Sequence, residues 1–188
     1  MKNAVLALVL ILFVGCSGTN KNVAPPPQTP QPESKKQVSN AVLGTYSTRL
    51  LDKSKARLKN INLAAEQINK VTLPPGETFS FNETVGPRLE NRGFQKAKIL
   101  IKKEKTMGYG GGICQLSTTI YNAALGAGLE IVERHEHEGE IGYVELGDDA
   151  TVNYPSLDLK IKNNKAVSIR FNCEMSEDEV IVKIISIQ

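Results

Sequence analysis

The feature that most limits the fold is a break in the apolar residues near the start of the chain. Between Ser17 and Asn40 there is almost no large apolar side chain, and prolines lie among Gln, Thr, Ser and Lys, at Pro25, Pro26, Pro27, Pro30 and Pro32. Such a segment cannot bury a core, and its prolines favour an extended, semi-rigid spacer. We therefore expect residues 16–40 to form a tether and residues 41–188 to form one domain of ordinary size.

The residues before the tether have the pattern of an export signal. Lys2 supplies a positive charge, Ala4 to Val14 is an unbroken apolar run, and Gly15 is small. The run is about half the roughly 20 residues that a membrane-spanning helix needs, which favours a signal peptide over residues 1–15. The stretch Phe13-Val14-Gly15-Cys16 resembles the lipobox of bacterial lipoproteins. This resemblance implies lipid on Cys16, attachment to a membrane, and a domain held in the cell envelope outside the cytoplasm.

Hydrophobic periodicity within residues 41–188 predicts an α+β fold. Leu58, Ile61, Ala65 and Ile68 form one stripe of a helix over residues 53–69, and a second helix is expected over residues 113–127. Phe79 and Phe81 alternate with polar residues, as in a short strand. We expect the two helices to pack on a mainly antiparallel sheet that ends in a C-terminal strand meander. The other expected strands are residues 97–101, 129–132, which continues into the histidines, 157–161, 167–173 and 179–187.

The net charge and the pattern of the glycine run exclude nucleic acids and nucleotides as partners. The formal net charge of +3 gives no basic field of the kind that nucleic-acid-binding proteins use. The run Gly110-Gly111-Gly112 has neither the lysine nor the spacing of a nucleotide-binding loop. We expect no nucleic acid and no cofactor, and nothing in the sequence sets the oligomeric state.

The residue best placed for chemistry is Cys114, because a glycine loop leads directly into the helix that carries it. Free N–H groups and the positive end of the helix dipole stabilise a thiolate in the first turn. The same N–H groups, near Gly112 to Gln115, could bind the oxyanion formed when a thiolate attacks a carbonyl. We expect Gly110, Gly111, Gly112, Gln115 and Tyr109 to contact the substrate, since glycines let a substrate backbone approach closely.

The chain has two histidines, both within residues 133–138. If this segment is a strand, His135 and His137 point to the same side as Glu133. A cysteine at a helix start with a histidine on a following strand is an arrangement of thiol hydrolases and acyltransferases. We assign His135 as general base with His137 as its close competitor, and Asp149 as the residue that orients the imidazole.

Two alternatives compete with this assignment. Cys114, His135 and His137 could form an open zinc site. The domain could instead be a non-catalytic envelope module that binds wall peptide or a partner protein, with a buried, unreactive Cys114. Cys173 lies in an alternating run that predicts an inward-facing strand position, which makes a disulfide with Cys114 unfavourable.

Several long motifs, in order, resemble those of the VanW family. They are Ser47-Thr48-Arg49, Leu73 to Asn82, Gly108 to Thr119, Tyr121 to Ala124, Gly128-Leu129-Glu130, Glu133 to His137, Gly147 to Thr151 and Leu157-Asp158-Leu159. The family is named for an accessory protein of B-type vancomycin-resistance clusters, and its members are commonly cell-envelope proteins. The resemblance implies an envelope role, with peptidoglycan or another envelope peptide as the partner. It adds support for Cys114 and His135 as an active centre acting on amide bonds of such peptides, by hydrolysis or by acyl transfer of the transpeptidase type.

Overall fold

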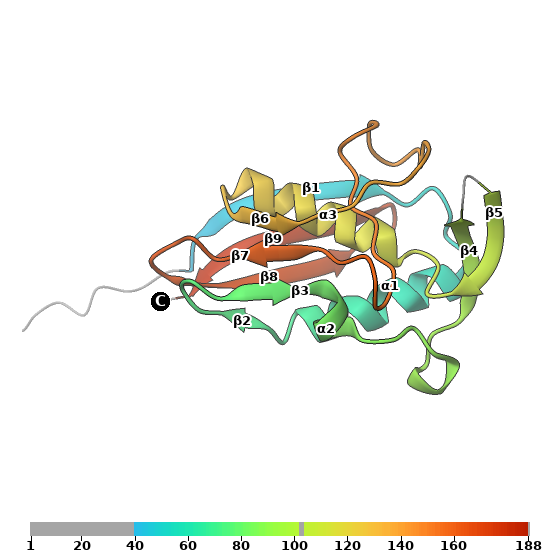
Figure 1. Ribbon diagram of the computed structural model, residues 1–188, viewed down its shortest axis with the longest axis horizontal. Helices are drawn as coiled ribbons and strands as arrows, with labels where there is room; N and C mark the ends of the chain where they lie inside the picture. The colour runs from blue at the N-terminus through green and yellow to red at the C-terminus, as the bar shows by residue number, and fades with distance from the viewer. Residues whose placement is uncertain (1–39, 102–103, 188) are drawn as a thin grey trace, which may run out of the picture. The chain divides into compact units, whose positions relative to one another are not determined.

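The computed structural model describes residues 40–101 and 104–187, and every strand pairing in them is antiparallel. The α+β prediction is confirmed (Figure 1). The elements, in chain order, are β1 (Val42–Arg49), α1 (Lys55–Ile68), β2 (Thr72–Leu73), β3 (Thr78–Ser80), α2 (Phe81–Val85), the 3-10 turn η1 (Glu90–Arg92), β4 (Lys96–Ile101), β5 (Glu104–Tyr109), α3 (Ile113–Gly126), β6 (Glu130–Glu133), β7 (Lys160–Lys162), β8 (Ser168–Met175) and β9 (Glu179–Ile187).

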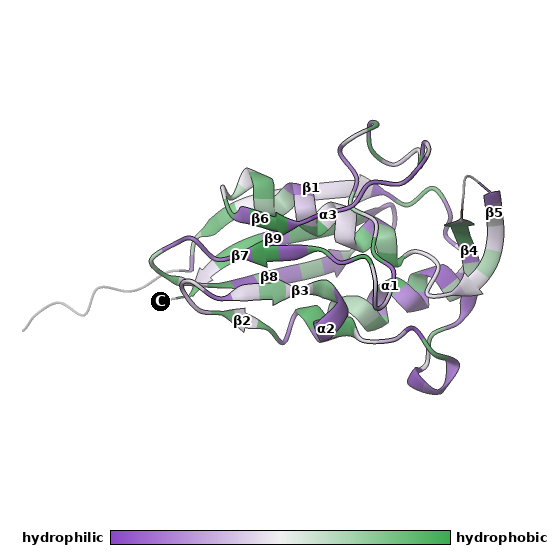
Figure 2. Ribbon diagram, in the orientation of Figure 1, coloured by the Kyte–Doolittle hydropathy of each residue, from purple (hydrophilic) through white to green (hydrophobic). Residues whose placement is uncertain are grey.

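The largest sheet has the strand order β1-β9-β8-β2. Along β8, Ile169, Phe171 and Cys173 are buried while the residues between them are more exposed, as the alternation in the sequence predicts. Strand β9 shows the same alternation through Val180, Val182 and Ile184. The apolar segments of these strands lie in the middle of the domain in Figure 2. One inward row of side chains on each strand therefore supplies much of the core.

The two long helices cover this sheet. Helix α3 lies against β1 and β9, and α1 lies against β8. The predicted stripe of α1 is buried at Ile61, Ala65 and Ile68. Strand β1 passes so close to α3 that a Cβ on Gly44 would lie 2.5 Å from the carbonyl oxygen of Ala123. The helix that carries Cys114 is thus fixed to the sheet along its length.

A smaller sheet has the order β3-β7-β6, and this arrangement corrects the predicted C-terminal meander. Strand β7 precedes β8 in the chain but pairs with β3 and β6. The two sheets meet where the rings of Phe79 and Phe171 lie 4.6 Å apart. Strand pairing over long sequence separations, which local periodicity does not encode, decided this topology.

Two local predictions differ from the structure, and a third is confirmed. Phe81 begins α2 instead of continuing a strand, because the Oγ of Ser80 caps the helix by accepting the N–H of Glu83 at 3.0 Å. Strand β6 ends at Glu133, so both histidines lie in an irregular segment. The expected strand at residues 97–101 is confirmed as β4, which pairs with β5 in a hairpin at the right of Figure 1.

None of the helices within residues 40–101 and 104–187 is both long enough and apolar enough to cross a membrane. Cys16 and the expected signal and tether lie outside the residues that the structure describes.

Candidate active site at the start of helix α3

The glycine loop between β5 and α3 is built so that only glycine fits. Gly110 and Gly112 have φ values of +81° and +106°, a region that other residues rarely adopt. A Cβ on Gly111 would lie 2.6 Å from the carbonyl oxygen of Lys98 in β4. Gly112 is the N-cap of α3, so no side chain caps this helix end. The loop therefore leaves the positive end of the helix dipole open beside Cys114.

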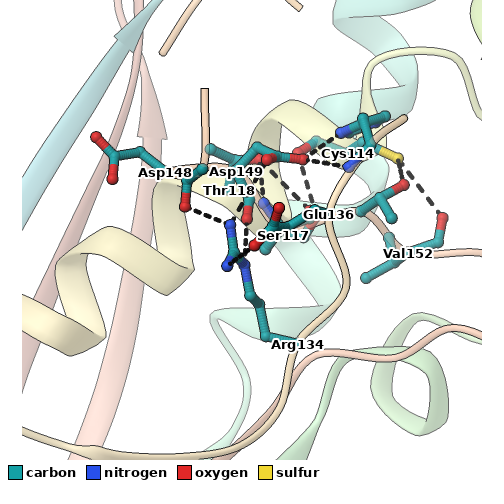
Figure 3. Close-up of polar contacts among 12 residues, drawn as sticks. Cys114, Ser117, Thr118, Arg134, Glu136, Asp148, Asp149 and Val152 are labelled. Atoms are coloured by element: carbon teal, nitrogen blue, oxygen red, sulfur yellow. Dashed lines mark hydrogen bonds and ion pairs between the residues drawn. The ribbon is translucent and has the colours of Figure 1, made fainter. Parts of the chain in front are cut away.

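Cys114, a residue of intermediate exposure, lies in the first turn of α3. Its Sγ lies 3.5 Å from the Oγ1 of Thr151 and 3.5 Å from the carbonyl oxygen of Val152, contacts that Figure 3 shows as dashed lines. Both partners belong to the long segment between β6 and β7. The site is thus formed where this segment crosses the start of α3.

His137 and Asp149 come together on the same long segment. The Nδ1 of His137 lies 2.5 Å from the Oδ2 of Asp149, and the backbone N–H of His137 donates to that oxygen at 2.8 Å. Both side chains are at least nine-tenths buried. Because Asp149 occupies Nδ1, the other ring nitrogen, Nε2, is left for the thiol. Asp149 therefore fixes both the tautomer and the orientation of the ring.

Cys114 and His137 shift one another's protonation. Burial raises the pKa of the Cys114 thiol, but its interactions with His137, Val152 and Thr151 outweigh burial and leave the pKa below the ordinary value. Burial lowers the pKa of His137, but Cys114 and Asp149 more than offset it, so the pKa is raised. Opposite shifts of this kind favour a thiolate–imidazolium pair.

His135, the first choice for a general base, has another partner. Its Nε2 lies 2.9 Å from the Oε1 of Glu133, whose second oxygen lies 2.8 Å from the Nζ of Lys160. These contacts lower the pKa of Glu133 to about 2, with Lys160 as the main cause and His135 the next. The geometry thus favours His137 over His135. The prediction rested on strand alternation through residues 133–138, and β6 ends before it applies.

The long segment is held by groups that sequence reasoning did not single out. Arg134 donates from Nε to the carbonyl oxygen of Asp149 at 2.6 Å and from Nη2 to that of Gly147 at 2.5 Å. Its guanidinium lies over the ring of Tyr121, 5.0 Å from the centroid. In Figure 3 Asp149 lies between Arg134 and Cys114. Arg134 therefore positions Asp149 from the side away from the thiol; its place directly before His135 was the one signal in the sequence.

A second set of contacts ties the segment to α3 itself. The Oγ of Ser117 donates to the carbonyl oxygen of Ala150 at 2.6 Å, and the N–H of Ala150 donates to the Oγ1 of Thr118 at 3.0 Å. Both hydroxyls lie on the first turns of α3, which places the residue after Asp149 directly against the helix. These bonds fix the distance between the carboxylate and the thiol.

The remaining predicted contact residues have different roles. The buried amide of Gln115 accepts from Arg57 at 2.8 Å and donates to Thr48 and to the carbonyl oxygen of Arg49, so its polar atoms are used within the protein. Tyr109 donates its hydroxyl to Glu90 at 2.7 Å. Neither side chain is directed at the thiol by these bonds. Gly110, Gly111 and Gly112 do border Cys114.

Two other groups are candidates for an oxyanion site. Among the described residues, the N–H of Cys114 has no backbone acceptor, while those of Ile113 and Gln115 bond to Gly110 and Gly112. Tyr143 lies close to Cys114 and Thr118, and burial raises the pKa of its phenol, which keeps it protonated as a donor. Tyr143 lies in irregular chain outside any periodic pattern, so no sequence motif pointed to it.

The zinc alternative finds no support in the arrangement of ligands. Within residues 40–101 and 104–187, no three His, Cys, Asp or Glu side chains are grouped so that they could hold a metal ion. His135, one of the three proposed ligands, is bound to Glu133 instead. Cys114 and Cys173 are both free thiols, and burial in the core raises the pKa of Cys173.

Comparison with known proteins agrees with the motifs. The family model described as "VanW like protein" matches residues 56–185. The chain is 43% identical over 135 residues to "Uncharacterized protein YoaR" of Bacillus subtilis (strain 168), covering 71% of this chain and 45% of that protein.

It is also 28% identical over 127 residues to "Vancomycin B-type resistance protein VanW" of Enterococcus faecalis (strain ATCC 700802 / V583), covering 65% of this chain and 46% of that protein. The chain thus spans less than half the length of these curated relatives. No solved structure matches it significantly. With a family model that covers most of the folded domain, the chain belongs to the VanW family.

Proposed function

We propose that the domain is a thiol enzyme that acts on amide bonds of cell-envelope peptides, such as peptidoglycan stem peptides. The observation that carries the proposal is the set Cys114, His137 and Asp149 at the uncapped start of α3. A cysteine, a histidine and a carboxylate are the parts of a thiol acyl-transfer site, and here Asp149 bonds to His137, which in turn lowers the pKa of Cys114. Cys114 itself is only partly buried.

In this reaction the Cys114 thiolate attacks the carbonyl carbon of the amide, and the oxygen takes up the electron pair. We assign the N–H of Cys114, which has no backbone acceptor, and the protonated phenol of Tyr143 as the donors to that oxyanion. Protonated His137 then donates its proton to the leaving amine as the C–N bond breaks, leaving a thioester on Cys114. Neutral His137 next takes a proton from water, or from an acceptor amine, as that molecule attacks the carbonyl carbon of the thioester. The C–S bond then breaks, and Cys114 is released as the thiolate beside protonated His137.

The envelope setting rests on two further observations. The lipobox-like residues Phe13 to Cys16 favour export and lipid attachment. One relative is a protein named for resistance to vancomycin. A Cys16→Ser protein is expected to leave the membrane fraction of the cell, and retention there would contradict the lipid anchor.

The test of the enzyme is turnover of purified peptidoglycan stem peptides, followed by mass spectrometry. The wild-type protein should release cleaved or exchanged peptide and accumulate a thioester on Cys114. A Cys114→Ala protein should lose at least about a thousandfold of the rate, the usual effect of removing such a nucleophile. His135→Ala is the matched control and should keep most of the activity. The enzyme proposal fails if Cys114→Ala is as active as wild type. It also fails if both proteins bind the peptide and neither cleaves or exchanges it, and the domain is then a binding module.

A further inference from the structure

One cation beside the proposed active site has no role in the reaction described above. Arg88 follows α2, and its guanidinium lies over two rings, 5.6 Å from the centroid of Phe81 and 6.0 Å from that of Tyr154. Its Nη1 donates to the carbonyl oxygen of Gly86 at 2.9 Å. The aromatic faces and this bond hold the planar group in one orientation.

The stem of Arg88 forms one wall of the glycine loop. A Cβ on Gly110 would lie 2.8 Å from the Cγ of Arg88 and 3.0 Å from its Cβ. Gly110 accepts the N–H of Ile113, the residue before Cys114. The guanidinium is therefore fixed next to the start of α3.

One nitrogen of the Arg88 guanidinium has no hydrogen-bond acceptor among the described residues. This nitrogen, Nη2, is buried. Burial lowers the pKa of Arg88 to about 10, while the nearby Cys114 and Asp158 act in the opposite direction. The carboxylate of Asp158 already accepts from the hydroxyl of Ser80 and the N–H of Asn82.

A buried guanidinium with a free N–H is costly unless an anion binds to it. The thiolate of Cys114 is one such charge, but His137 is its main partner. A carboxylate carries a single charge and can accept from the one nitrogen left here, whereas a phosphate dianion would need more donors.

We propose that Arg88 binds the terminal carboxylate of a peptide and thereby places the last amide bond of that peptide at Cys114. The inference rests on the proposed thiol chemistry and narrows its substrate class to peptides with a free C-terminus. One residue separates the scissile carbonyl from the terminal carboxylate, a span of about 3.8 Å between α-carbons. The terminal amino acid leaves as its amine takes the proton from His137, and the rest of the peptide stays on Cys114 as the thioester.

A pair of alkylating reagents tests the carboxylate site without a substrate. Thiolate displaces iodide from iodoacetate and from iodoacetamide in the same way, but only iodoacetate carries a carboxylate. We expect the ratio of the two rates, iodoacetate over iodoacetamide, to fall about tenfold or more in Arg88→Gln, the effect of losing one hydrogen bond to a charged group. Arg88→Lys should give an intermediate ratio. Arg170→Gln, which removes an exposed arginine on β8, should leave the ratio unchanged. An equal ratio in wild type and Arg88→Gln would overturn the inference.

A binding experiment separates this inference from the proposed reaction. Isothermal titration calorimetry measures ligand binding to a Cys114→Ser protein. The ligands are acetylated tripeptides of L-alanine and of D-alanine, each as the free acid and as the C-terminal amide, and inorganic phosphate. The free acid of one configuration should bind about tenfold or more tightly than its amide, and Arg88→Gln should abolish the difference. If Cys114→Ser binds the free acid more tightly than the amide, and Cys114 of the wild-type protein does not react in the alkylation experiment, the carboxylate site is retained and the enzyme proposal is rejected. Reactive Cys114 with no preference for the acids, or with tighter binding of phosphate, would reject the carboxylate site and retain the enzyme.

Discussion

Two histidines two positions apart have different surroundings, and these surroundings divide their roles. His137 is enclosed with Asp149 and the thiol of Cys114, while the ring of His135 is more exposed and bonds to Glu133. An enclosed histidine with a carboxylate on one nitrogen can exchange a proton at the other, which the proposed reaction requires. Glu133 instead bonds both to His135 and to Lys160 of β7, and these contacts hold the end of β6 against β7.

The first prediction concerns the pH dependence of alkylation. Because His137 lowers the pKa of Cys114, the iodoacetamide rate of wild type should rise at a pH below the ordinary pKa of a cysteine thiol. In His137→Ala only burial and the contacts with Val152 and Thr151 still act on the thiol, so the pH midpoint of the alkylation rate should move upward. The rate at pH 7 should then fall about tenfold or more, since each pKa unit changes the thiolate fraction tenfold.

His135→Ala is the matched control for this measurement, because it removes an imidazole from the same segment. Its alkylation profile should overlay that of wild type. A midpoint that rises in His135→Ala but stays in place in His137→Ala would contradict the assignment of the base.

At the scale of secondary structure, the site depends on three elements meeting at the start of α3. Strand β4 of the hairpin β4–β5 lies against Gly111, and the segment between β6 and β7 carries His137 and Asp149. Helix α3 carries the thiol and has an uncapped N-terminus. The loop is strained for any residue except glycine, so the backbone itself sets the position of Cys114 relative to the hairpin.

The second prediction tests this close approach. Gly111→Ala would bring a methyl group to 2.6 Å from the carbonyl oxygen of Lys98, a backbone atom that cannot move without shifting β4. We expect a loss of about 1–3 kcal/mol in the free energy of unfolding, as in other overpacked sites, together with slower alkylation of Cys114. Urea denaturation and iodoacetamide kinetics measure the two effects.

Gly126→Ala is the control, since a Cβ there meets nothing within 4 Å at the end of α3. This change should leave alkylation as it is and raise the free energy of unfolding by up to about 1 kcal/mol, because alanine favours the helix. Equal effects of the two substitutions would mean that the approach of β4 to the loop is not rigid.

For the domain as a whole, the junction of the two sheets keeps the site's elements in register. Phe79 of the smaller sheet and Phe171 of the larger one are both buried and in contact. The smaller sheet also carries β6 and β7, whose connecting segment holds His137 and Asp149, whereas α3 packs on the larger sheet. The geometry of the site therefore depends on how the two sheets pack.

The third prediction follows from that dependence. Phe171→Ala removes a fully buried ring from the junction and should lower the free energy of unfolding by about 3–5 kcal/mol. Val42→Ala, at a side chain 57% exposed on β1, should change it by no more than about 0.5 kcal/mol. Urea denaturation with an unchanged slope checks both, and a small effect of Phe171→Ala would show that the sheets do not share one core.

The sequence by itself determined the parts that depend on local pattern. The apolar stripe of α1, the alternation that buries Cys173 in β8, and the glycine entry to α3 with Cys114 in its first turn are all properties of neighbouring residues. The family motifs pointed to the same cysteine, histidines and aspartate.

Only the tertiary structure decided which of these residues meet. Strand β6 ends at Glu133, so alternation could not rank His135 against His137, and the choice of His137 follows from Asp149 reaching it across an irregular segment. Similarly, β7 joins β3 rather than β8, and Arg88 comes to the glycine loop from a distant turn. These contacts join residues far apart in the chain, whose pairing is set by packing of the whole core and not by local periodicity.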